Sequence, residues 1–191
     1  AYVSLDSVYT VAPDEQAVVL RFGKLNSTTM PGLHLKIPLV DRVLKVSIEE
    51  HSLRLPGGAA DNIRAANDEN DTLMLTGDLN TAGVEWTIQW KVVDPADYLF
   101  RLPEDDRDEF ARQLLTTVSR TVMNRLVGDY SFDEVIGAKR SDITHEAREA
   151  VQKILDEYKC GISVPSLQMQ RVTPPSQVRP AFDRVNAAIQ E

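Results

Sequence analysis

Apolar and polar residues alternate along much of the first half of the chain, which is the period of a half-buried β-strand. The longest alternation puts five apolar residues on one face, namely Val84, Trp86, Ile88, Trp90 and Val92. Shorter alternations cover residues 18–22, 33–39 and 44–48. The polar stretch Pro56–Asp71 predicts a long loop, and Thr76-Gly77-Asp78 predicts a tight turn. The pattern therefore predicts an antiparallel sheet with one face against the core.

From about residue 104 the apolar residues recur with the period of a helix. The first helix is expected to start after the acidic run 104–109 and to end at Gly128, with the apolar stripe Phe110, Leu114, Leu115, Val118, Val122 and Leu126. Ser131 and Glu134 form a capping-box signature ahead of a second helix. Its apolar face is Ile143, Ala147, Val151, Ile154 and Tyr158, and Gly161 is expected to close it.

The end of the chain predicts one more strand and an outgoing helix. Leu167 and Met169 alternate with glutamines, and Pro174-Pro175 then interrupts the strand. The tail has apolar residues spaced four, three and four, namely Val178, Phe182, Val185 and Ile189, which we interpret as a candidate coiled-coil seam. Strands, two helices, a strand and a final helix predict an α+β fold.

Composition and charge narrow the function further. Of the 191 residues, 42% are hydrophobic and 26% charged, as in a folded soluble domain, and the formal net charge is −8. A surface of that sign repels phosphate backbones, so we expect no nucleic-acid partner. The single cysteine, Cys160, excludes an intrachain disulfide. No apolar run is long enough to span a bilayer, but both ends look cut, so an anchor is expected outside this sequence.

The sequence shows no constellation that points to catalysis. His34, His51 and His145 are far apart and lack metal-ligand spacing. The Asn67–Asp71 cluster lacks the glycine and closing glutamate of a calcium loop. No phosphate-binding glycine loop or nucleophile motif occurs. We therefore predict a protein that is not an enzyme, with no catalytic residues, no cofactor and no metal.

Several motifs together resemble the SPFH (stomatin, prohibitin, flotillin and HflK) superfamily, and most closely its HflK branch. They are VAPDEQAVVLRFGKL at residues 11–25, MPGLHLKIPLVDRVLKV at 30–46, LMLTGDLN at 73–80, VEWTIQWKVVDPADYLF at 84–100 and PPSQVRPAFDRVNAAIQE at 174–191. Each motif alone is weak, but they follow the order expected for the family over nearly the whole chain.

The resemblance implies both an architecture and a function. It implies a strand-rich first SPFH subdomain at residues 1–100, an α+β second subdomain at 101–173, and the start of a long coiled-coil helix at 174–191. A single membrane-spanning helix would precede Ala1 and place this domain on the periplasmic side of the inner membrane. The family assembles into large rings or cages, HflK by alternating with an HflC-like subunit. Such a scaffold surrounds and regulates the membrane protease FtsH.

One candidate contact surface follows from the motifs. We hypothesise that five residues after the Pro-Gly turn face the membrane or a neighbouring subunit, namely Leu33, Leu35, Ile37, Pro38 and Leu39. The alternative, that they fill the core, is equally open from the sequence. Two other functions also remain open: a stomatin-like organiser of membrane microdomains, and a hydrolase whose Ser, Asp and His meet only in three dimensions.

Overall fold

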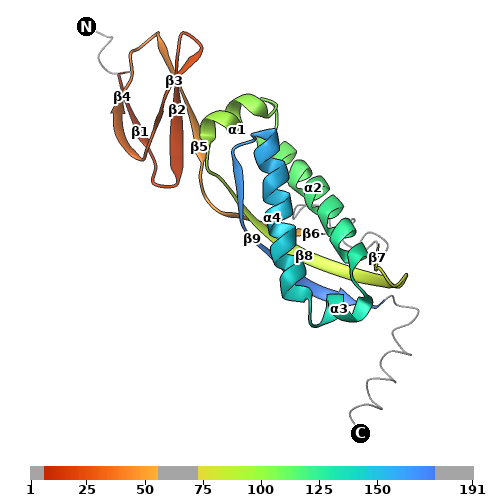
Figure 1. Ribbon diagram of the computed structural model, residues 1–191. Coiled ribbons are helices and arrows are strands. Elements are labelled where there is room, and N and C mark those ends of the chain that lie inside the picture. Colours follow the sequence, from red (N-terminus) through yellow and green to blue (C-terminus); the bar gives the residue numbers. More distant parts are fainter. Residues whose placement is uncertain (1–6, 56–72, 175–191) are drawn as a thin grey trace. The chain divides into compact units, whose positions relative to one another are not determined.

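The computed structural model describes residues 7–55 and 73–174 and is α+β, as the sequence pattern predicts (Figure 1). The strands before the helices are β1 (Val8–Val11), β2 (Glu15–Arg21), β3 (Lys24–Thr29), β4 (Gly32–Leu35), β5 (Asp41–Ser47), β6 (His51–Leu55), β7 (Leu73–Leu75) and β8 (Thr81–Val92). They are followed by α1 (Pro95–Arg101), α2 (Arg107–Asp129), α3 (Phe132–Ile136), α4 (Arg140–Tyr158) and β9 (Ile162–Thr173). The predicted loop at 56–71 and the predicted tail helix lie outside the described residues.

The chain forms two compact units, each built from separate stretches of sequence. The first unit comprises residues 1–51, 90–111 and 155–163, and the second comprises 52–89, 112–154 and 164–191, in each case as far as these residues are described. The subdomain boundaries inferred from the resemblance, at 100/101 and 173/174, stay a prediction.

The first unit is organised around β2, which pairs antiparallel with both β3 and β5. Ala17, Val18, Val19 and Leu20 are all buried, because α1 packs against β2 in addition to the sheet neighbours. The alternation predicted at 18–22 is therefore wrong at two positions. Val19 is buried and not solvent-facing, and Phe22 leaves the strand altogether. A separate antiparallel pair, β1 with β4, completes the strands of this unit.

The core of the second unit is the one that the sequence predicts most accurately. β8 lies in a four-stranded sheet with β6, β7 and β9, and Val84, Trp86 and Ile88 are fully buried on its predicted inner face. The buried faces of the two long helices contribute Leu115, Val118, Ser119, Val122, Met123, Leu126, Val127, Ile143, Ala147 and Val151. The α2 stripe is thus rotated from the predicted one, since Phe110 is exposed and Leu114 is only half-buried.

Helix boundaries follow capping chemistry more closely than hydrophobic period. The hydrophobic pattern does not predict α1, yet Asp94 accepts hydrogen bonds from the Ala96 and Asp97 N–H groups at 2.9 and 3.1 Å, and Pro95 occupies the first turn. The Glu134 carboxylate accepts from the Ser131 N–H, which confirms the capping box. This box starts the short α3, which ends at Gly137, so α4 is a separate helix.

Gly161 is confirmed as a left-handed residue after α4, with φ of +70°. Its carbonyl accepts from the N–H groups of Val93 and Asp94, which brings the chain after β8 close to the start of β9. A Cβ at this position would lie 2.2 Å from the Asp94 carbonyl oxygen. A side chain is therefore excluded both by backbone conformation and by space.

We expect Gly161→Ala to lower the free energy of unfolding by about 3 kcal/mol or more, because left-handed strain adds to a backbone clash. Gly23 offers a matched control, since its φ is +79° but a methyl group there would meet no other atom within 4 Å. Gly23→Ala should lose only about 1–2 kcal/mol. Urea unfolding followed by circular dichroism measures both; equal losses would contradict the close approach at Gly161.

Candidate membrane or subunit contact surface

The β1–β4 pair has one inward face and one outward apolar face. In its register Val8 lies opposite Leu35 and Thr10 opposite Leu33, so these four side chains share a face. Leu33 and Leu35 are 72% and 79% exposed, and Val8 is exposed as well. The opposite face carries Tyr9, whose hydroxyl lies 3.1 Å from the Thr29 hydroxyl. The outward face of this pair is therefore uncharged, apolar and open to solvent.

The turn after β4 extends this apolar surface. Leu39 is fully exposed and adopts φ of +70°, a left-handed conformation that is unusual for a leucine. The turn is closed by the Asp41 N–H, which donates to the Ile37 carbonyl oxygen at 2.9 Å. Ile37 is also exposed, and Pro38 between them is half-buried. Backbone strain at an exposed apolar tip is typical of a segment selected for contact and not for stability alone.

A second apolar tip lies at the hairpin between β2 and β3. Phe22 and Gly23 both have positive φ, at 50° and 79°, between the paired residues Arg21 and Lys24, which describes a two-residue hairpin turn of type I′. Phe22 is 81% exposed. Its N–H donates to the Val40 carbonyl oxygen at 3.2 Å. The Phe22 tip and the Leu39 turn are therefore joined directly through the backbone.

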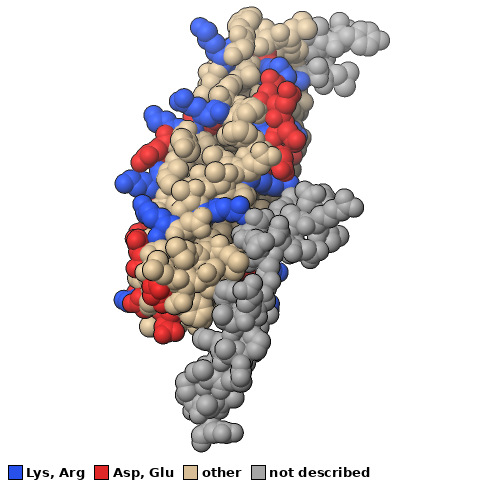
Figure 2. Space-filling model, turned by 90° about the vertical axis from the view of Figure 1, so that its right-hand side faces the viewer, with Lys and Arg blue, Asp and Glu red and all other residues tan. Residues whose placement is uncertain are grey.

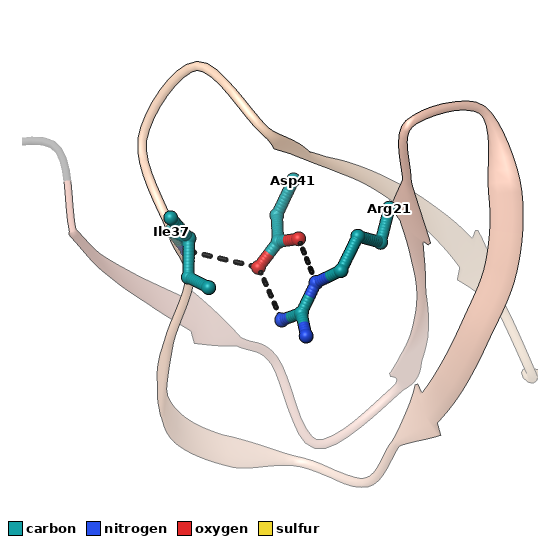
Figure 3. Close-up of polar contacts among 3 residues, drawn as sticks. All are labelled: Arg21, Ile37 and Asp41. Carbon is teal, nitrogen blue, oxygen red and sulfur yellow. Dashed lines mark hydrogen bonds and ion pairs between the residues drawn. The ribbon is translucent and has the colours of Figure 1, made fainter.

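An ion pair fixes the two tips against each other, as Figure 3 shows. Arg21 donates from Nε to Asp41 Oδ1 at 2.8 Å and from Nη2 to Oδ2 at 3.1 Å. The same Oδ2 accepts from the Ile37 N–H at 2.9 Å. These hydrogen bonds, that of Arg21 above all, hold the pKa of the Asp41 carboxyl below its ordinary value. One almost fully buried carboxylate therefore anchors both the hairpin and the turn.

We call the exposed set Val8, Phe22, Leu33, Leu35, Ile37 and Leu39 the apolar surface of the first unit. Leu33, Leu35, Ile37 and Leu39 are candidates from the sequence, and the structure shows them exposed, so the alternative that they fill the core is wrong. Their role in membrane or subunit contact stays a prediction. The sequence pattern misses Val8 and Phe22, although an aromatic residue before the glycine of a tight hairpin is an available signal for Phe22. The candidate seam at Val178, Phe182, Val185 and Ile189 lies outside the described residues.

The groups that might have suggested chemistry lie apart. The ring nitrogen of His34 bonds the Met30 carbonyl oxygen at 2.7 Å, the His51 ring stacks 4.8 Å from that of Trp90, and His145 pairs with Glu149 at 3.4 Å. Burial raises the pKa of the Cys160 thiol. Within residues 7–55 and 73–174 no cluster of three or more His, Cys, Asp or Glu side chains has the geometry to hold a metal ion.

Two further surface features bear on partners. In the described part of the chain no helix is both long and apolar enough to cross a membrane. The face that Figure 2 shows carries basic side chains at several places and one continuous row of acidic ones. The net charge of −8 therefore conceals local regions of either sign.

This fold and these motifs define the class of protein. The model of the SPFH domain / Band 7 family matches residues 9–191, nearly the whole sequence, so the chain belongs to that family. The resemblance inferred from the motifs is thereby confirmed.

Its relatives within the family are HflK proteins. Protein HflK of Treponema pallidum (strain Nichols) is 37% identical over 95% of this chain and 56% of its own length. Protein HflK of Borreliella burgdorferi is 34% identical over 99% of this chain and 60% of its own. The Escherichia coli (strain K12) relative, named modulator of FtsH protease HflK, is 29% identical over 94% of this chain and 38% of its own. The chain thus spans between 38% and 60% of the length of these relatives.

We expect the Asp41 ion pair to stabilise the first unit in a pH-dependent way. Because the folded-state pKa of Asp41 is lowered, its contribution is present above the unfolded pKa of about 3.9 and is lost as pH falls through the folded value. Asp41→Asn should therefore be less stable than the wild type at pH 7, and the difference should shrink below about pH 4. Urea unfolding at pH 7, 5 and 3 measures this; a difference that stays constant across the series would contradict the pairing.

Proposed function

We propose that this chain is the periplasmic domain of a non-enzymatic, membrane-anchored scaffold subunit. The subunit assembles with an HflC-like partner into a large ring or cage and regulates an FtsH-like membrane protease. The names of the HflK relatives support this proposal, because the Escherichia coli relative is named as a modulator of FtsH protease. The apolar surface of the first unit supports it independently, since a folded domain rarely exposes so many large apolar side chains together without a partner.

The apolar surface would lie in the interfacial region of the bilayer beside the membrane anchor. Burying one side chain such as Phe22 or Leu39 contributes about 1.5–3 kcal/mol. Basic residues adjoin the tips in sequence, with Lys24 after the hairpin, Lys36 before the turn and Arg42 after it. Cations at that level interact favourably with anionic headgroups by about 1 kcal/mol each. Apolar tips with basic neighbours favour a lipid surface over a neighbouring subunit as the partner.

Replacing both tips, as Phe22→Ser with Leu39→Ser, should reduce the partitioning of this chain onto phosphatidylglycerol/phosphatidylethanolamine vesicles by roughly tenfold or more, because two buried side chains are lost. Leu79→Ser is the matched control, since Leu79 is 80% exposed with φ of +63° but belongs to the second unit. Vesicle flotation reads the bound fraction. Unchanged binding by the double variant would refute lipid contact at these tips.

The partner proposal is tested on the full-length protein in its membrane. Affinity purification after mild detergent extraction should recover an HflC-like subunit and an FtsH-like protease in a large complex. A stomatin-like organiser of microdomains would instead give oligomers and membrane association without the protease. The hydrolase alternative predicts turnover of a broad ester and peptide panel by the purified chain, so a panel without turnover together with protease recovery would support the scaffold.

A further inference from the structure

The second unit contains an open groove that the proposed membrane contact does not use. Its volume is about 630 Å³. One wall is the α3–α4 link with the first turns of α4, and the other wall is the middle of β9. The lining residues are Gly137, Ala138, Arg140, Ser141, Thr144, His145, Arg148, Pro165, Ser166, Leu167, Gln168 and Met169. A groove between a helix and a strand is wide enough for a segment of polypeptide and open along its length.

Side chains of α4 hold the two walls in place at both ends of this groove. Towards the start of β9, the Gln152 side chain accepts a hydrogen bond from the Val164 N–H at 2.7 Å. Towards its end, the Arg140 guanidinium donates to the Gln170 carbonyl oxygen at 2.9 Å and also to that of Met169. The groove opens between these two braces. It is a preorganised feature, so a ligand would not have to order its walls.

The charge of the groove is opposite to that of the chain. Its lining includes Arg140, His145 and Arg148 and contains no carboxylate, whereas the whole chain has a net charge of −8. The acidic groups nearest to it in sequence are already engaged. Asp142 pairs with Lys139 at 3.2 Å, and Glu149 lies 3.4 Å from His145 and 3.7 Å from Arg148. Hydroxyl and amide groups of the lining add hydrogen-bond donors. This chemistry recognises an acidic peptide segment.

The first unit carries such a segment in the turn between α1 and α2. Glu104, Asp105 and Asp106 follow one another there, and all three are exposed. Asp106 has φ of +61°, and its carbonyl accepts from the Phe110 N–H at 2.9 Å. The turn is further fixed by the Tyr98 hydroxyl, which donates to Asp108 at 2.6 Å. Three carboxylates are thus presented on a preformed turn, which lowers the entropy lost on binding.

We propose that the acidic turn at residues 104–106 of one copy binds in the basic groove of a second copy of this chain. Such a contact is heterologous, with a different surface on each partner, and repetition of it produces a ring when the rotation closes. The inference rests on the self-association within the proposed function and names the surfaces that carry it. Its energy is electrostatic, so association should weaken as salt rises.

A charge-swap experiment on the full-length protein tests this contact. Arg148→Glu reverses the sign of the groove, and Asp105→Arg reverses the middle of the turn. Each variant alone should associate with itself roughly tenfold more weakly than the wild type, as read by energy transfer between two dye-labelled populations in detergent. A mixture of the two variants should recover association to within about threefold, because the unaltered groove of one variant then meets the unaltered turn of the other, and the two reversed surfaces are again of opposite charge.

Lys153→Glu is the matched control, because it makes the same charge change at an exposed position on α4 outside the groove lining. It should leave self-association unchanged. The inference is overturned if the mixture stays as weak as either variant, or if Lys153→Glu weakens association equally. Recovery of the HflC-like and FtsH-like partners by the wild type is scored separately, so loss of this contact and failure of the proposed function give different results.

Discussion

The buried carboxylate of Asp41 is the point on which the apolar surface depends. It accepts two hydrogen bonds from Arg21 and one from the Ile37 backbone, and it lies opposite Arg21 in the β2–β5 register. Without it, the turn that carries Leu39 and the hairpin that carries Phe22 would be joined only by the bond from the Phe22 N–H to Val40. Both tip residues occupy left-handed backbone conformations, which side chains of their size adopt only when the surroundings enforce them.

This arrangement explains why exposed apolar residues persist in a stable domain. The inner faces supply the burial that folding needs, through Ala17–Leu20 in the first unit and Trp86 with Ile88 in the second. The outer face of the β1–β4 pair adds little to that burial. Apolar residues retained there, beside tips whose backbone is strained, are explained by what they contact outside the chain. Leu79 is also exposed with positive φ, but its N–H bonds the Thr76 carbonyl oxygen within a tight turn, so local geometry alone accounts for it.

The sequence predicts the fold class and the inner face of β8 correctly, because a period of two over nine residues leaves few alternatives. The same period at residues 33–39 does not say which side is wet, since an apolar row on a strand fits a core and a contact surface equally well. Only the pairing of β4 with β1, and its lack of a covering layer on the outer face among the described residues, decides between them. The pairing partner of a strand is a non-local property that periodicity does not encode.

The helices show a second limit of the same kind. Asp94-Pro95 is a readable start signal for α1, but that helix is too short for its hydrophobic period to stand out. The capping box at Ser131 is correctly predicted, yet it begins a five-residue helix that Gly137 ends. That break matters for function, because the link it creates forms one end of the basic groove. The groove combines residues from α4 and β9, and their basic character is invisible in a chain whose net charge is −8. Net charge constrains partners only on average, whereas recognition depends on the sign of the few side chains that line one surface.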